Sequence, residues 1–111
     1  MEKDVLIKAL EKSVKKWKTI IDIHKNNPAL NTESKLLNVL LEKIPELESE
    51  NSYCPLCTLY IRYACKECPM IIEEKKCWHD NSLYSKWADN ACEETAQPIL
   101  KHLKLEYSKL K

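Results

Sequence analysis

The sequence contains no glycine and only one arginine, Arg62. Average glycine usage of about 7% would place several in a chain of this length, so its turns are expected to avoid positive φ or to obtain it from asparagine. Five asparagines fall at predicted breaks between helices: Asn26, Asn27, Asn51, Asn81 and Asn90. A chain without glycine also excludes the Gly-rich phosphate loops of P-loop and dinucleotide-binding enzymes.

Long apolar runs and a leader-type N-terminus are also missing. No stretch approaches the roughly 20 apolar residues of a membrane-spanning helix. The chain moves from Met1 to Asp4 straight into an amphipathic pattern, without the apolar stretch and cleavage site of a signal peptide. Hydrophobic residues make up 44% and charged residues 32%, which is a globular balance. We therefore expect one domain over residues 1–111 that works in the cytoplasm and does not bind membranes.

Apolar periodicity predicts an all-α fold, a small bundle of four or five helices. Residues 4–25 carry apolar side chains at steps of three and four residues, and residues 32–44 repeat this pattern behind a capping Asn31 or Thr32. Pro45 disfavours the α conformation at Ile44, so the second helix is expected to end or kink there. Residues 58–63 fit a strand and a helix equally well.

Residues 81–110 predict two further helices. The first is short, carries Trp87 and is expected to be capped by Asp80 or Asn81. The second spans roughly residues 91–110 and contains Pro98, which predicts a break or a fresh helix start near Gln97. Between these helices and the N-terminal pair, residues 53–78 form a cysteine-rich segment.

Two C-x2-C pairs and a fifth cysteine are crowded into this segment, and a sixth cysteine, Cys92, lies apart. Thiolates are soft ligands that suit zinc, and C-x2-C pairs are the usual way of presenting them. If residues 57–65 are helical, about 12 Å separates Cys57 from Cys65, so one site on both pairs needs an irregular connection. Alternatively, Cys77 and His79 complete a site with one pair. The candidate zinc ligands are Cys54, Cys57, Cys65, Cys68 and Cys77.

Other cysteine chemistries remain open. Six cysteines allow three disulfides, although a cytoplasmic setting argues against them outside hyperthermophiles. The Cys54-Pro55-Leu56-Cys57 motif matches a redox dithiol if it opens a helix, because a helix N-terminus favours the Cys54 thiolate. No βαβ pattern precedes it, which argues against that use. The Cys68-Pro69 dipeptide matches iron–sulfur motifs only weakly.

The cysteine pattern continues into a Tyr-x2-Trp motif and resembles a cysteine-rich family of small uncharacterised proteins of tailed phages and bacteria. The resemblance covers residues 53–87, and Trp17 matches an upstream family tryptophan. Glu67 and Ser82-Leu83 stand where family members often carry Gly and Thr-Pro. The resemblance implies an accessory protein of a virus or mobile element, in the host-cell cytoplasm if viral, and implies no activity. The matching residues are Cys54, Cys57, Cys65, Cys68, Pro69, Cys77, Tyr84 and Trp87.

Several further residues have plain structural interpretations. The three tryptophans, Trp17, Trp78 and Trp87, are expected in the core. His24 is expected to be a partly exposed residue at a helix end, and His102 to be solvated among lysines. Cys92 is expected to be a buried thiol, or the partner of Cys77 if disulfides form.

The charge distribution is mild. Residues 1–25 carry seven lysines and four acidic residues, a net +3, and residues 96–111 also carry +3 from four lysines and one glutamate, whereas the whole chain carries +1. A dedicated DNA-binding protein usually has a stronger basic bias.

No grouping of residues predicts a catalytic site. We therefore expect a non-enzymatic protein-binding or adaptor module with structural cysteines. A nucleic-acid-binding regulator and a thiol–disulfide oxidoreductase are the alternatives, and the oligomeric state stays open.

Overall fold

The computed structural model of the chain describes residues 3–50, 53–60, 68–69 and 81–110. These residues contain five α-helices and one short 3-10 helix and no strand, which confirms the all-α prediction. Within the same residues, no helix is both long enough and apolar enough to cross a membrane.

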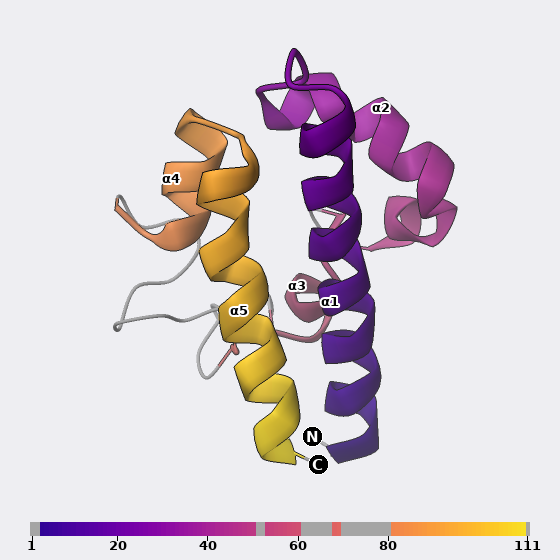
Figure 1. Cartoon of the computed structure of the whole chain (residues 1–111). Helices are drawn as coiled ribbons and strands as arrows, with labels where there is room; N and C mark the ends of the chain where they lie inside the picture. The colour runs from indigo at the N-terminus through magenta and orange to yellow at the C-terminus, as the bar shows by residue number, and fades with distance from the viewer. Residues whose placement is uncertain (1–2, 51–52, 61–67, 70–80, 111) are drawn as a thin grey trace.

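Helix α1, Lys3–Asn26, is the element against which most of the described chain packs. It contacts α5, Glu93–Leu110, and the two helices run antiparallel, so that the two ends of the chain meet at one end of the molecule (Figure 1). Both helices contribute their apolar stripes to one core because positions three and four residues apart share a helix face. The most deeply buried side chains between these helices are Leu10, Ile20, Ile99 and Leu103.

Helix α2, Glu33–Lys43, packs on α1 and buries Leu36 and Leu40. It begins as predicted, because the Thr32 side chain accepts a hydrogen bond from the backbone N–H of Lys35 at 3.1 Å. It ends at the predicted Ile44, and Pro45 opens a 3-10 helix, η1, over Pro45–Ser49.

Two short helices follow. Helix α3, Pro55–Tyr60, packs against α1 and shows that residues 58–60 are helical rather than extended. Helix α4, Leu83–Asp89, packs beside the start of α5 (Figure 1). The prediction that Asp80 or Asn81 caps α4 is wrong. Ser82 is the cap, and its hydroxyl accepts from the backbone N–H of Ser85 at 3.0 Å.

Helix α5 corrects a second prediction, since it passes through Pro98 without a break. Pro98 lies one and a half turns into the helix, and its side chain is exposed. The ring removes one backbone hydrogen bond. The buried Ala96, Ile99 and Leu103 on the opposite face nevertheless hold this turn against the rest of the core.

Among the described residues, two have the positive φ that glycine would normally supply, and one of them is not an asparagine. Asn81 has φ of 66°, which confirms that asparagine supplies one left-handed residue. Tyr53 has φ of 55°, so the expectation that asparagine alone would do so is wrong. A tyrosine in this conformation is strained, and such strain persists only where the surroundings impose it. Tyr53 directly precedes the first cysteine of the segment.

A candidate thiolate site at the start of helix α3

The first cysteine pair opens helix α3. Cys54 is the residue before Pro55, and its carbonyl accepts the first helical hydrogen bond, from the N–H of Thr58 at 3.2 Å. Pro55 fits the first helical position because it has no N–H to satisfy there. The Cys54 sulfur accepts hydrogen bonds from the backbone N–H groups of Leu56 and Cys57. Cys54 therefore occupies the position that serine or aspartate takes in ordinary helix caps.

These contacts favour the thiolate form of Cys54. The hydrogen bond from the Cys57 side chain is the largest cause, and together with the positive charge of Lys16 and the two backbone N–H groups it lowers the pKa of Cys54 from 9.0 to about 6. Burial of the sulfur acts in the opposite direction and is outweighed. At neutral pH, Cys54 is thus a thiolate, the form of cysteine that binds metals and attacks disulfides.

Lys16 of α1 is the residue of this site that the sequence did not indicate. Its side chain is 5% exposed, and its ammonium lies 5.5 Å from the centroid of the Trp17 ring. A buried ammonium is costly unless an opposite charge or a π-face compensates it, and the Cys54 thiolate and the Trp17 ring supply both. Nothing in the sequence distinguishes Lys16 from the other lysines of α1, so only the packing of α3 onto α1 reveals its position.

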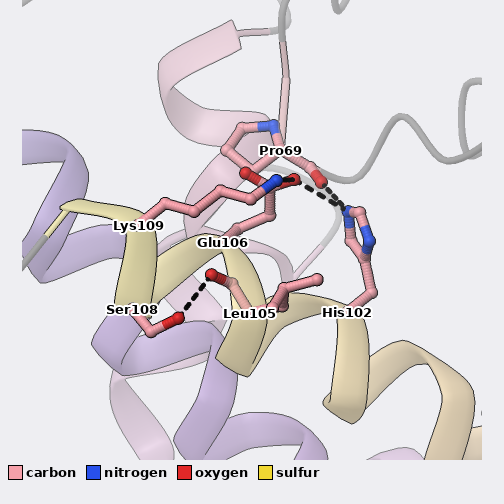
Figure 2. Close-up of polar contacts among 6 residues, drawn as sticks. All are labelled: Pro69, His102, Leu105, Glu106, Ser108 and Lys109. Atoms are coloured by element: carbon pink, nitrogen blue, oxygen red, sulfur yellow. Dashed lines mark hydrogen bonds and ion pairs between the residues drawn. The ribbon is translucent and has the colours of Figure 1, made fainter.

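Of the second cysteine pair, the structure describes Cys68. Cys68 is buried, at 8% exposure, and belongs to the main hydrophobic core. The carbonyl of its neighbour Pro69 accepts a hydrogen bond from His102 Nε2 at 2.6 Å, and Figure 2 shows the ring of His102 directed at this oxygen. Glu106 lies 3.6 Å from the same nitrogen and 3.6 Å from Lys109 Nζ. His102 is therefore half-buried and in contact with the cysteine segment, which corrects its prediction as a solvated residue.

The structure places only some of the predicted zinc ligands close to one another. Cys54 and Cys57 are brought together, whereas the described residues contain no group of three or more side chains that could hold a metal ion, so Cys68 does not join that pair. No disulfide joins any two of the four described cysteines. Cys65, Cys77, His79 and Trp78 lie outside the described residues. The five-cysteine zinc site therefore stays a prediction.

Three other predictions, for the tryptophans, His24 and Cys92, have clear outcomes. Trp17 and Trp87 are core residues, at 2% and 1% exposure, as expected. His24 is not partly exposed but 5% exposed, because Trp87 of α4 covers it. Cys92 is half-buried, which corrects its prediction as a buried thiol, and its sulfur lies 3.5 Å from the hydroxyl of Thr95 at the start of α5.

Known proteins add nothing to this description. No protein-family model matches the chain, and neither a curated protein nor a solved structure matches it. The resemblance to the phage and bacterial cysteine-rich family thus rests on the residue pattern alone.

Proposed function

We propose that the chain is a non-enzymatic protein-binding module, an accessory protein of a virus or mobile element, whose cysteines hold one wall of its binding pocket. The observation that carries this proposal is an open pocket of about 410 Å³ between the beginning of α1 and the end of α5. Its volume falls in the range of roughly 300–1,000 Å³ typical of ligand sites. One wall is Leu6, Leu10 and Leu110 with Glu106 and Lys109, and the other is Tyr60, Cys68 and Pro69.

The second wall belongs to the cysteine-rich segment. Tyr60 ends helix α3, which Cys54 and Cys57 begin, and Cys68 and Pro69 follow eight residues later. A six-residue helix is too short to be stable by itself. Its position therefore depends on its packing against α1, through the buried Leu56, and on what its first turn binds. A metal held by Cys54, Cys57 and further cysteines of the segment would fix that turn and, with it, the pocket wall.

The donor set supports a zinc ion in this role. Zinc requires deprotonated cysteines, and Cys54 is a thiolate at neutral pH with the Cys57 sulfur beside it. A tetrahedral structural site needs two more ligands. Cys65 and Cys77 are the candidates that the sequence supplies, since Cys68 does not lie with this pair. When bound, the ion would contribute cross-linking rather than chemistry.

Intact mass of the purified, unreduced protein tests the metal. The proposal expects a mass excess that matches zinc in the native protein and vanishes on denaturation. Cys54→Ser and Cys57→Ser should lose this excess, whereas Cys92→Ser, which alters a cysteine outside the segment, should keep it. A deficit of hydrogen pairs without metal, or six thiols without metal, would overturn the zinc centre.

Binding through the pocket has its own test. Leu110→Glu places a charge in the pocket, whereas Leu105→Glu places it on the same helix at a residue that is 55% exposed and outside the pocket. A partner captured by the wild-type protein and by Leu105→Glu, but not by Leu110→Glu, would support the pocket as the binding surface. Equal capture by all three proteins would contradict it.

A second candidate function is thiol–disulfide exchange, because Cys54-Pro55-Leu56-Cys57 does open a helix. In this reaction the Cys54 thiolate attacks a substrate disulfide, forms a mixed disulfide and releases one substrate thiol. The Cys57 thiolate then displaces the second substrate thiol and leaves a Cys54–Cys57 disulfide, so the substrate gains the two electrons that the dithiol loses. Insulin reduction that Cys54→Ser abolishes and Cys92→Ser retains would establish this function. The absence of such activity in the metal-free protein would remove it.

The nucleic-acid alternative gains no support from the described surface. The exposed lysines of α1 are interspersed with three exposed acidic residues, Asp4, Glu11 and Asp22. Binding to DNA or RNA that weakens steeply with salt would revive it.

A further inference from the structure

His24, near the end of α1, is buried with both ring nitrogens engaged. Trp87 of α4 donates its indole N–H to His24 Nε2 at 3.1 Å. The other ring nitrogen donates to the backbone carbonyl of Leu30, between α1 and α2. The histidine is thus neutral, with its proton on Nδ1, because Nε2 must carry a free lone pair to accept from Trp87.

A second proton would have to bind His24 Nε2, the atom that accepts the hydrogen bond from Trp87. An Nε2–H would point at the indole N–H, so that two donors would face each other and the hydrogen bond to Trp87 would be lost. The charge would also be buried, since His24 is 5% exposed. Burial accordingly lowers the pKa of His24 below its ordinary value of 6.5, and the Leu30 hydrogen bond and Glu93 oppose this shift only partly.

The charged groups around His24 do not relieve this conflict. Glu93 at the start of α5 is the acidic group that acts on the ring, and Lys25 lies 3.9 Å from its carboxylate. On the side of α2, Glu33 accepts a hydrogen bond from the hydroxyl of Tyr84. Both of these carboxylates therefore already have a partner.

Helix α4 depends on this contact more than the rest of the fold does. It has seven residues, and Trp87 is its only fully buried side chain. The Trp87 ring packs edge-on against Trp17 and lies beside Tyr84 and His24. Helices α1 and α5 pack together through separate residues, including Leu10, Ile99 and Leu103. A short helix with a single fully buried side chain is the type of element that opens locally while the remaining structure stays folded.

We propose that His24 and Trp87 form a proton-operated latch, which holds α4 on α1 at neutral pH and releases α4 on acidification while α1 and α5 remain packed. The closed state binds fewer protons than the open state between the lowered pKa of His24 and 6.5. The latch is therefore fully closed above pH 6.5 and weakens as pH falls through this window. The expected loss is about tenfold in the closed-to-open ratio per pH unit within it.

Amide hydrogen exchange of the full-length protein at pH 7.5 and pH 5.0 tests the latch. Rates are divided by those of an unstructured chain at each pH, so that the intrinsic effect of pH cancels. Protection of Lys86 to Asn90, whose N–H groups are hydrogen-bonded in α4, should fall at pH 5.0. Protection in the middle of α1 and α5 should not. Unchanged protection in α4, or an equal loss in all three helices, would overturn the proposal.

His24→Gln is the matched variant, because a carboxamide oxygen can accept from Trp87 and does not titrate in this range. Its α4 protection should be the same at both pH values. This variant keeps Cys54, which also titrates in the range, so a persistent loss in His24→Gln would assign the effect elsewhere and refute the latch. If His24→Gln does not fold, the NMR titration of His24 in the wild-type protein decides. Its midpoint must lie below 6.5 and coincide with the loss of α4 protection.

Discussion

The indole of Trp87 meets the indole of Trp17 edge to face, with ring centroids 4.9 Å apart and an interplanar angle of 81°. The two residues are seventy positions apart in the chain and come from α4 and α1. This geometry places the positive edge of one ring against the negative face of the other, which favours it over parallel stacking. It joins the C-terminal part of the fold to the central helix.

This pair should be energetically coupled. Trp87→Ala is expected to lower the free energy of unfolding by about 3–5 kcal/mol, the usual cost of removing a buried tryptophan. Trp17→Leu, Trp87→Leu and the double variant, compared by guanidinium unfolding followed by circular dichroism, should show a coupling of about 1 kcal/mol. Strict additivity of the two single variants would contradict the edge-to-face contact.

Cys54 should react as a thiolate well below the ordinary range of cysteine. In metal-free protein, alkylation of Cys54 by iodoacetamide, located by peptide mass spectrometry, should be half-maximal near pH 6 rather than 9.0. Cys57→Ala removes the largest cause of the lowered pKa and should move the midpoint upward. Lys16→Gln should move it upward too, whereas Lys18→Gln, an exposed position on the same helix, should not. A midpoint near 9 in the wild-type protein would refute the site.

The same shift predicts how Cys54 affects stability. Between about pH 6 and 9.0, the folded protein holds Cys54 as a thiolate while the unfolded chain keeps the proton. The folded state binds fewer protons there, so the contribution of Cys54 to stability rises with pH. It is fully present above pH 9.0 and is lost as pH falls through 6. Denaturant unfolding of metal-free wild-type protein should show this rise, and Cys54→Ser should lack it.

Pro98 should limit the stability of α5. Because α5 continues through this exposed residue, Pro98→Ala restores the backbone hydrogen bond to the carbonyl of Glu94 without a change in the core. The expected gain is about 1–3 kcal/mol, from the interior cost of proline less the added flexibility of the unfolded chain. The thermal midpoint measures this gain, and a lower midpoint would show that the ring is needed where it is.

Substitutions on the face of α5 that packs on α1 should lower the free energy of unfolding more than substitutions on its outer face. Leu103 is fully buried and Leu105, two residues on, is 55% exposed. Leu103→Ala should cost about 2–5 kcal/mol of unfolding free energy, whereas Leu105→Ala should stay within about 0.5 kcal/mol. Urea unfolding of both variants checks this, and equal effects would contradict the orientation of α5.

The main helices could be predicted from the sequence because their causes are local. The three- and four-residue spacing from Leu6 to Ile21 is enough to define α1, and Thr32 and Pro45 bound α2 by capping and by backbone sterics. The same reasoning misplaced the cap of α4 at Asp80 or Asn81. Serine at position 82 is as good a cap, and only the backbone path decides among neighbouring cap formers.

The cysteine spacing by itself determined that Cys54 and Cys57 would lie together, since two residues between them cover less than a helical turn. Only the tertiary structure decided that Lys16 turns inward to Cys54, that Trp87 covers His24 and that Pro69 accepts from His102. Each of these contacts joins residues that are more than 30 positions apart. Periodicity reports which face of a helix is apolar, but a buried polar side chain is explained only by the partner that another element brings to it.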